Sequence, residues 1–405
     1  MHIFKHPNCQ HRLSWLIALV VIAGSLFGTT TTSEVYAQRR KSVFDQTDSK
    51  TEAEKMAAEK MATQKKANQP DPRAAAAAKK KQQELASKFA PQVVVLEVKK
   101  EGVQLVATWF PPIIEDKKEK QADKKKAPVD QNAKKDKEAG KSTAPFILVH
   151  DWSRSRADLL MLASFLQQQG HAVIVPDLRG HGESVGMLGS TKLLDHKKFN
   201  KADKASAVGD IDQCKRFLQE KNNEGIINID LLNIVAVGDS CHLAIAWTLA
   251  DWAWEPMGGM KQGKDVKSLI LFSPTKKFAG SSLKKLMKSP LISGRKATPL
   301  PMLVVWGEQS AVAKDNNDFI DLLRKFRPEV PEGTDLATLW ATQNLFHFQA
   351  STTMSGFELA GNPNAKQIWT FANNFVSQKV LVSKDQYPWQ IRGADAVIKA
   401  RDAEK

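Results

Sequence analysis

The chain is poor in cysteine, with three among 405 residues. Cys9 precedes an apolar run at the N-terminus, which leaves Cys214 and Cys241 in the body of the chain. Two thiols are too few for a disulfide framework, and no cysteine cluster has the spacing of a metal site. We therefore expect Cys214 and Cys241 to be buried, unpaired thiols in helices. No phosphate-binding glycine loop is present either, so the sequence implies no cofactor and no metal.

Long apolar runs are also absent, apart from Leu13–Phe27. This run has about 15 residues, fewer than the ~20 that span a bilayer as a helix. Lys5 and Arg12 precede it, and Val35–Ala37 resembles a small-residue cleavage site. We predict a cleaved signal peptide over 1–37 and export to the periplasm or the medium. An uncleaved membrane anchor is the alternative.

Acidic residues do not balance the basic ones, and the formal net charge is +15. Two segments carry +9 of it: 38–90 has 13 basic and 7 acidic residues, and 115–143 has 10 basic and 7 acidic residues. Charge in low-complexity segments argues against a specific nucleic-acid interface, which concentrates it on one folded face. Segment 38–90 has few aromatic or β-branched residues, which predicts a disordered linker. It serves as a flexible tether or, alternatively, adheres to an anionic envelope surface.

From residue 145 onward, short apolar runs alternate with helical patterns. The run Phe146–Val149 is wholly apolar, which is typical of a strand buried on both faces. Strands that alternate with helices predict a mostly parallel sheet covered on both sides. The expected strands are 93–98, 103–110, 146–149, 172–175, 231–237, 269–272, 302–306 and 345–348. The expected helices are 156–169, 202–220, 240–251, 316–326 and 364–380.

Distinctive residues follow four of these strands, at the edge where such sheets bind ligands. They are His150-Asp151-Trp152, Asp177-Leu178-Arg179-Gly180-His181-Gly182-Glu183-Ser184, Gly238-Asp239-Ser240-Cys241-His242 and Gly307-Glu308-Gln309-Ser310. In this order the chain resembles the α/β-hydrolase superfamily, particularly its lysophospholipase, monoacylglycerol lipase and serine-aminopeptidase-like branch. The resemblance implies an α/β-hydrolase domain over 91–380 that contains the lysine-rich insert 115–143. It also implies about eight strands flanked by helices on both faces, with 381–405 as a C-terminal tail. Only 275–298 separates the sixth and seventh strands, so we expect little or no cap domain.

The resemblance places Ser240 at the nucleophile position, on a sharp strained turn between strand and helix. The family pattern there is G-x-S-x-G, and His242 stands where the second glycine is expected. The same resemblance assigns the oxyanion hole to the N–H groups of Cys241 and Trp152. Asp151 replaces the usual glycine before Trp152, which brings a side chain and a negative charge toward the site.

The other two members of a catalytic triad are replaced. Ser310 stands at the acid position, and Ser355 stands at the base position after the last strand. Glu308 and Asp315 are nearby carboxylates, and we interpret both as solvent-facing. His347 is the only histidine after Ser310. It is a candidate base with Glu308 or Asp315 as its acid, although its apolar neighbours favour an ordinary sheet residue.

A serine without an adjacent base is a weak nucleophile, and losing triad members lowers turnover by roughly 10⁴–10⁶. We therefore favour a catalytically impaired exported protein that binds a small ligand or a protein partner. A working serine hydrolase of esters or small amides is one alternative, and a lysine-rich surface-adhesion protein is another. The fold alone does not decide among them.

Overall fold

The computed structural model describes residues 89–114, 139–257, 260–327 and 329–393. The predicted signal peptide, residues 38–88 of the predicted linker, 115–138 of the lysine-rich insert and 394–405 of the predicted tail lie outside the described residues. Within the described part, no helix is both long enough and apolar enough to cross a membrane.

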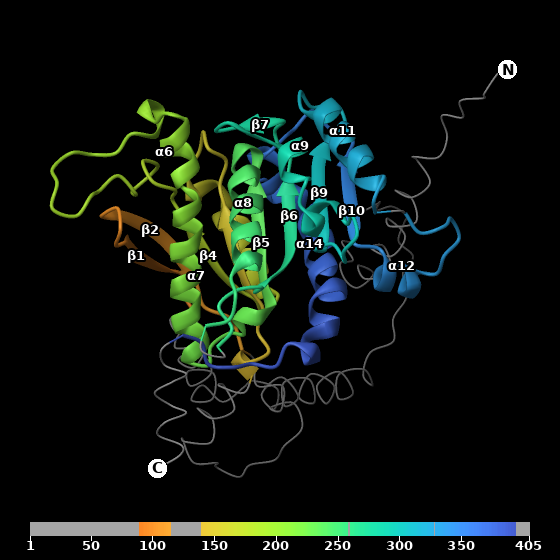
Figure 1. The fold of residues 1–405 in the computed structure, drawn as a ribbon, viewed down its shortest axis with the longest axis horizontal. Helices are drawn as coiled ribbons and strands as arrows, with labels where there is room; N and C mark the ends of the chain where they lie inside the picture. The colour runs from red at the N-terminus through yellow and green to blue at the C-terminus, as the bar shows by residue number, and fades with distance from the viewer. Residues whose placement is uncertain (1–88, 115–138, 258–259, 328, 394–405) are drawn as a thin grey trace, which may run out of the picture. The chain divides into compact units, whose positions relative to one another are not determined.

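An eight-stranded, mostly parallel sheet forms the centre of the described chain (Figure 1). β1 and β2 form an antiparallel hairpin, and β2 pairs antiparallel with β4. The other six strands are parallel to one another, so their C-terminal ends form one edge, here called the carboxyl edge, and their N-terminal ends form the amino edge. The spatial order is β1 (Gln92–Val98), β2 (Val103–Phe110), β4 (Ala172–Pro176), β3 (Pro145–Val149), β5 (Leu232–Val237), β6 (Val266–Phe272), β9 (Met302–Gly307) and β10 (Leu345–Ala350).

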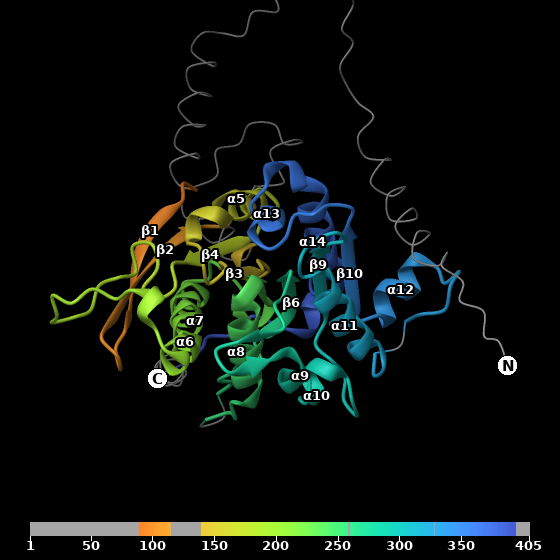
Figure 2. The same cartoon turned by 90° about the horizontal axis from the view of Figure 1, so that it is seen from above.

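The central strands are apolar along both faces because helices cover both faces. Every residue of β3, β4, β5, β6 and β9 is buried. Helices α7 (Val208–Asn223), α8 (Cys241–Ala253) and α11 (Ala313–Arg324) cover one face, and α5 (Leu160–Gln168) and α14 (Lys366–Lys379) cover the other (Figure 2). This architecture confirms the expected fold class.

Several elements differ from the predicted ones. The helix expected over 202–220 is divided into α6 (Lys201–Ser206) and α7, and Asn200 closes a capping box at the start of α6. The connection between β6 and β9 holds a two-stranded ribbon and two short helices. The elements that the sequence did not indicate are β7 (Lys277–Phe278), β8 (Ser281–Ser282), α9 (Leu283–Leu286), α10 (Pro290–Ser293), α12 (Leu336–Thr342) and α13 (Phe357–Ala360).

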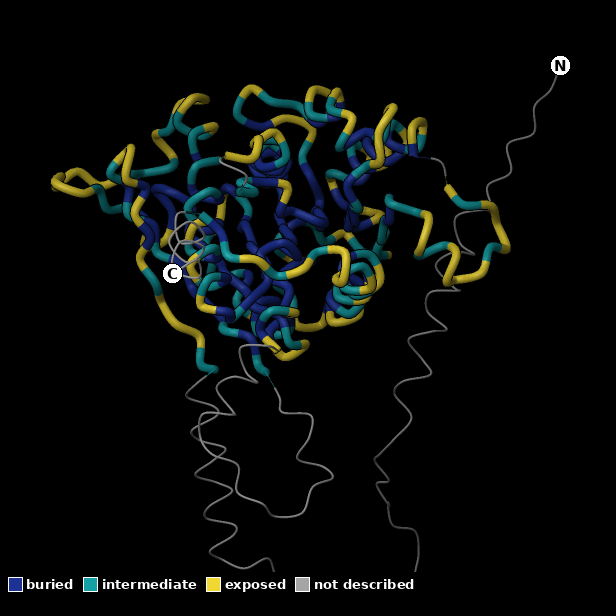
Figure 3. Tube along the Cα trace, turned by 60° about the horizontal axis from the view of Figure 1, so that its bottom comes forward, coloured by how far each residue is buried: buried dark blue, intermediate teal, exposed yellow. Residues whose placement is uncertain are grey.

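The domain extends beyond Val380. A short helix over Leu381–Gln386 follows α14, and the next residues run along the amino edge of the sheet (Figure 1). Asn228 Nδ2 donates to the backbone oxygen of Tyr387 at 2.8 Å, which fixes this segment to the domain. Residues 381–393 are therefore part of the folded unit and not of a tail. Buried residues concentrate in and around the sheet (Figure 3). They include both remaining cysteines, which are free thiols in α7 and α8, as predicted.

Candidate functional site

The candidate site lies at the carboxyl edge, where β3 and β5 end side by side. Val149 of β3 pairs in register with Ala236 of β5, so the residues that follow each strand are brought together. These are Asp151 from the first strand and Gly238 from the second. A third segment reaches the same place, because a Cβ built on Gly356 would lie 3.9 Å from Asp151 Oδ2.

The turn between β5 and α8 has its left-handed residue at Gly238 and not at Ser240. Gly238 has a φ of 56°. Ser240 has φ −70° and ψ −10°, which is ordinary right-handed backbone. A positive φ is strained for any residue with a Cβ, and this strain is the mark of a nucleophile elbow. The prediction that Ser240 occupies the strained turn is therefore wrong, and the residue at that turn has no side chain.

Asp151 fills the space that a side chain on Gly238 would need. A Cβ built on Gly238 would lie only 1.6 Å from Asp151 Oδ2. The other carboxylate oxygen accepts from the backbone N–H and the hydroxyl of Ser153, at 2.9 and 2.8 Å. The carboxylate is thus held in position from the β3 side. Serine at 238 and aspartate at 151 exclude each other in this geometry.

His150 fixes the backbone on which Asp151 sits. Its Nε2 accepts from the backbone N–H of Leu178 at 3.0 Å, and its Nδ1 donates to the backbone oxygen of Asp151 at 2.7 Å. Complete burial lowers the pKa of the His150 imidazole, which favours the neutral form, and the two hydrogen bonds require the proton on Nδ1. The side chain is a positioning element within the loop and not a proton carrier.

Ser240 lies beneath the turn, two residues after Gly238. Its hydroxyl is fully buried and has no hydrogen-bond partner. Ala236, two residues before Gly238, is equally buried. Ala236 and Ser240 are both small and lie two residues on either side of Gly238, which lets strand and helix approach closely. The stretch Ala236–Ser240 therefore has small residues at its first and last positions and the turn glycine in its centre.

His242 packs inside the domain and does not crowd the turn. Its Nε2 donates to the backbone oxygen of Thr275 at 2.7 Å. Burial lowers the pKa of this imidazole. Its neighbour Asp239 is half-buried, and burial raises the pKa of the carboxyl, while Thr275 Oγ1 donates to it at 2.6 Å. Asp239 directly follows the turn residue Gly238, whereas Cys241 stands three residues after it.

Of the two N–H groups predicted to form the oxyanion hole, that of Cys241 donates to the backbone oxygens of Gly238 and Asp239, and that of Trp152 stays a prediction. Cys241 opens α8, and its thiol donates to the backbone oxygen of Ala236 at 3.4 Å. Burial raises the pKa of that thiol well above its usual range. Trp152 is buried, with its ring 4.7 Å from the His181 ring and 5.2 Å from the Phe278 ring. Trp152 remains near the carboxyl edge as part of an aromatic cluster.

The structure does not bring His347 to Ser240. His347 lies within β10, in register with Val304, and β6 and β9 lie between β10 and β5. Three strand spacings correspond to roughly 14 Å, beyond hydrogen-bond reach of Ser240. The imidazole stacks on Trp306 at 5.8 Å and lies 3.5 Å from an Arg324 nitrogen. Burial lowers its pKa, with Arg324 adding to the effect. His347 is a sheet residue, as the competing interpretation held.

The remaining triad positions hold no base or acid that could serve Ser240. Ser310 donates its hydroxyl to the backbone oxygen of Gly307 at 2.8 Å. Ser355 donates its N–H to Glu358 at 3.0 Å. Glu308 accepts from the Ser351 hydroxyl at 3.3 Å, and Asp315 pairs with Lys276 at 3.2 Å. The side chains of Ser310, Glu308 and Asp315 are thus bonded to groups other than Ser240.

The loop Asp177–Ser184, which carries the strongest sequence motif, is stabilised by its own hydrogen bonds and supports the site. Asp177 accepts from the backbone N–H groups of Arg156 and Glu183, at 2.7 and 3.0 Å. A Cβ on Gly182 would lie 2.2 Å from the Asp177 carboxylate, which explains the glycine. The motif secures the loop that contacts Trp152. Within the described ranges no group of three or more histidine, cysteine or acidic side chains could hold a metal ion.

Similarity to known proteins is found among solved structures only. Neither protein-family models nor curated proteins match the chain. Among solved structures, it is similar to an α/β serine hydrolase without lid from Xanthomonas campestris, at 11% identity and a TM-score of 0.42, over 72% of this chain and 95% of that one. It is also similar to Thermogutta terrifontis esterase 2, at 16% identity and a TM-score of 0.44, over 71% and 94%. A predicted CIB-like hydrolase from Thermoplasma acidophilum gives 15% identity and a TM-score of 0.38, over 70% and 99%.

Proposed function

We propose that this chain is an exported α/β-hydrolase-type protein that lacks serine hydrolase activity and binds a ligand or protein partner. One observation carries the proposal: the strained turn at the carboxyl edge holds Gly238, and the Asp151 carboxylate fills the place of the missing side chain. Export rests on the predicted signal peptide at 1–37.

The alternative, a working enzyme that uses Ser240 and His347, has little physical support. A serine hydroxyl needs a base within about 2.6–3.2 Å. The Ser240 hydroxyl is buried without a partner, and His347 lies across two intervening strands. Losing triad members lowers turnover by roughly 10⁴–10⁶, which leaves no more than what binding alone provides.

A fluorophosphonate probe tests the proposal directly. We expect the purified full chain to remain unlabelled and to hydrolyse nitrophenyl acetate no faster than the Ser240→Ala variant, because no base can deprotonate the hydroxyl. Ser153→Ala is the matched control, since Ser153 is exposed at the same edge. Labelling or ester turnover that disappears only in Ser240→Ala would contradict the proposal.

A surface-adhesive role for the lysine-rich segments is a second candidate, favoured by their share of the charge. Residues 38–90 carry 13 basic and 7 acidic side chains. We expect a full chain in which 38–90 is replaced by a Gly/Ser linker of equal length to bind isolated envelopes more weakly. Binding by the natural chain should also weaken as salt rises from 50 to 500 mM, because screening shortens the Debye length from about 14 to about 4 Å. Equal binding of both chains would exclude adhesion through this segment.

A further inference from the structure

The last described segment of the chain is held along the amino edge almost entirely by polar groups. We call Tyr387–Gly393 the strap. Among these residues only Arg392 is buried, whereas the others are exposed or half-exposed. The apolar core therefore contributes little to holding the strap, and its hydrogen bonds and ion pairs determine whether it stays.

The strap is bound as an extended peptide is bound in a groove. Three asparagine side chains of the domain donate to its backbone oxygens, which recognises a peptide without reading its side chains. Trp389 Nε1 donates in turn to the backbone oxygen of Asn222 at 3.0 Å. The three contacts are Asn228 Nδ2 to Tyr387 O at 2.8 Å, Asn222 Nδ2 to Gln390 O at 2.9 Å and Asn223 Nδ2 to Arg392 O at 2.9 Å.

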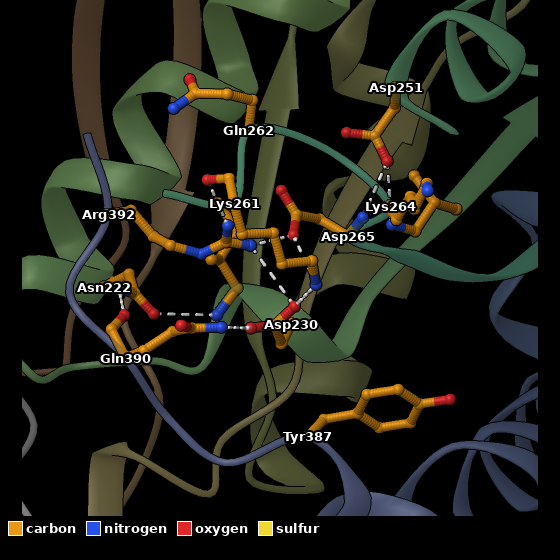
Figure 4. A network of polar contacts seen from close by, with 12 residues as sticks. Asn222, Asp230, Asp251, Lys261, Gln262, Lys264, Asp265, Tyr387, Gln390 and Arg392 are labelled. Carbon is orange, nitrogen blue, oxygen red and sulfur yellow. Dashed lines mark hydrogen bonds and ion pairs between the residues drawn. The ribbon is translucent and has the colours of Figure 1, made fainter. Parts of the chain in front are cut away.

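Two side chains of the strap contact the carboxylates of the domain: Gln390 Nε2 donates to Asp230 at 3.2 Å, and Arg392 makes the larger set of contacts. The Arg392 guanidinium, with a side chain only 1% exposed, forms ion pairs with Asp265 and, at 3.3 Å, with Asp230. It also donates to the backbone oxygen of Lys261 at 2.7 Å (Figure 4). A planar fork of donors matches this set of acceptors better than the single point charge of an ammonium group.

The acceptors that line the Arg392 pocket belong to the domain, and they suit a cationic hydrogen-bond donor. Both carboxylates are nearly fully buried: Asp230 is 2% exposed and Asp265 is 0% exposed. Asp251 is the third carboxylate of the network. Three lysines, Lys215, Lys261 and Lys267, lie close to these three carboxylates, so the pocket without Arg392 holds no excess charge. Removal of Arg392 instead takes a donor away from two buried carboxylates and from a backbone oxygen, which is unfavourable unless another donor refills the place.

We propose that this groove is a binding site for an extended peptide that carries an arginine, and that the strap is its displaceable resident ligand. Asp230 precedes β5 and Asp265 precedes β6, which places the groove at the amino edge. The candidate site at the carboxyl edge lies at the opposite ends of the same strands. The proposed peptide groove and the proposed loss of hydrolase activity can therefore be tested independently of each other.

The test uses the full chain with 387–392 replaced by Gly/Ser residues, which vacates the groove. The probe is a fluorescent peptide of sequence YPWQIRG, and its binding is measured by anisotropy. We expect saturable binding that weakens at least ~10-fold when alanine replaces the arginine, because a charge-assisted hydrogen bond contributes that much or more. A lysine peptide should bind more weakly than the arginine peptide. If the variant unfolds cooperatively yet binds no peptide, or binds the arginine and alanine peptides equally, the proposal is wrong.

A second variant covers failure of the first to fold. In Arg392→Ala, amide hydrogen exchange across 387–393 should speed at least ~10-fold, as expected when a contact of this kind is lost. Millimolar ethylguanidinium should restore the protection by filling the vacant pocket, whereas ethylammonium at equal ionic strength should not. Lys384→Ala, an exposed change just before the strap, is the matched control. The proposal of a pocket specific for guanidinium would be contradicted if Arg392→Ala left the exchange protection unchanged, or if both cations restored it equally.

Discussion

Replacing Gly238 with serine, which would place a nucleophile at the turn, is expected to destabilise the domain by about 2–5 kcal/mol. The left-handed backbone accounts for roughly 1–2 kcal/mol of this loss for a residue with a Cβ. The new Cβ also overlaps Asp151 Oδ2, which lies 1.6 Å from its position, so the carboxylate must move away from Ser153. Urea unfolding of the purified chain measures the loss.

Two further variants separate strain from overlap. Gly280→Ser is the matched control, because Gly280 has a φ of 80° but nothing within 4 Å of a Cβ. It should lose only the strain, about 1–2 kcal/mol. Adding Asp151→Gly to Gly238→Ser should recover the part that overlap causes. If Gly238→Ser costs no more than Gly280→Ser, Asp151 does not occupy the side-chain position at the turn.

The sheet could be predicted because each of its central strands can be recognised from its own local sequence. β3 is apolar at every position because helices cover both faces, and the same holds for β5, β6 and β9. Short elements such as β7, with two residues, have too little periodicity to be recognised. The segment after Val380 was missed for another reason: its partners are polar groups that are distant in the sequence, such as Asn228.

The sequence could predict where the candidate site lies, but not which residue occupies its turn. Gly238-Asp239-Ser240 fits the family pattern with serine at the turn, and Ala236-Val237-Gly238-Asp239-Ser240 fits it equally well with glycine there. Only the backbone conformation shows which residue occupies the turn, and the positive φ lies at Gly238. The position of Asp151 follows from the pairing of β3 with β5, which no local pattern specifies.

The second large effect is expected at the buried ion pairs of the amino edge. Lys215 of α7 pairs with Asp251 at 2.5 Å and with Asp265 at 2.8 Å, and all three side chains are at most 1% exposed. Lys215→Met removes the cation and leaves both carboxylates buried. Breaking a buried pair in this way destabilises a protein by about 3–5 kcal/mol. We expect thermal and urea unfolding at pH 7 to show a loss of this size.

The neighbouring residue provides the control, and pH provides the check on mechanism. Arg216→Ala removes an ion pair with Asp212 at 2.9 Å, but the arginine side chain is 62% exposed, so the loss should be at most ~1 kcal/mol. Burial raises the pKa of Asp251, and Lys215 opposes that rise. Without Lys215 the folded state binds a proton at Asp251 more readily than the unfolded state does. The deficit of Lys215→Met should therefore shrink as the pH falls from 7 toward 5. A deficit that stays constant over this range would mean that lost packing, and not uncompensated charge, causes it.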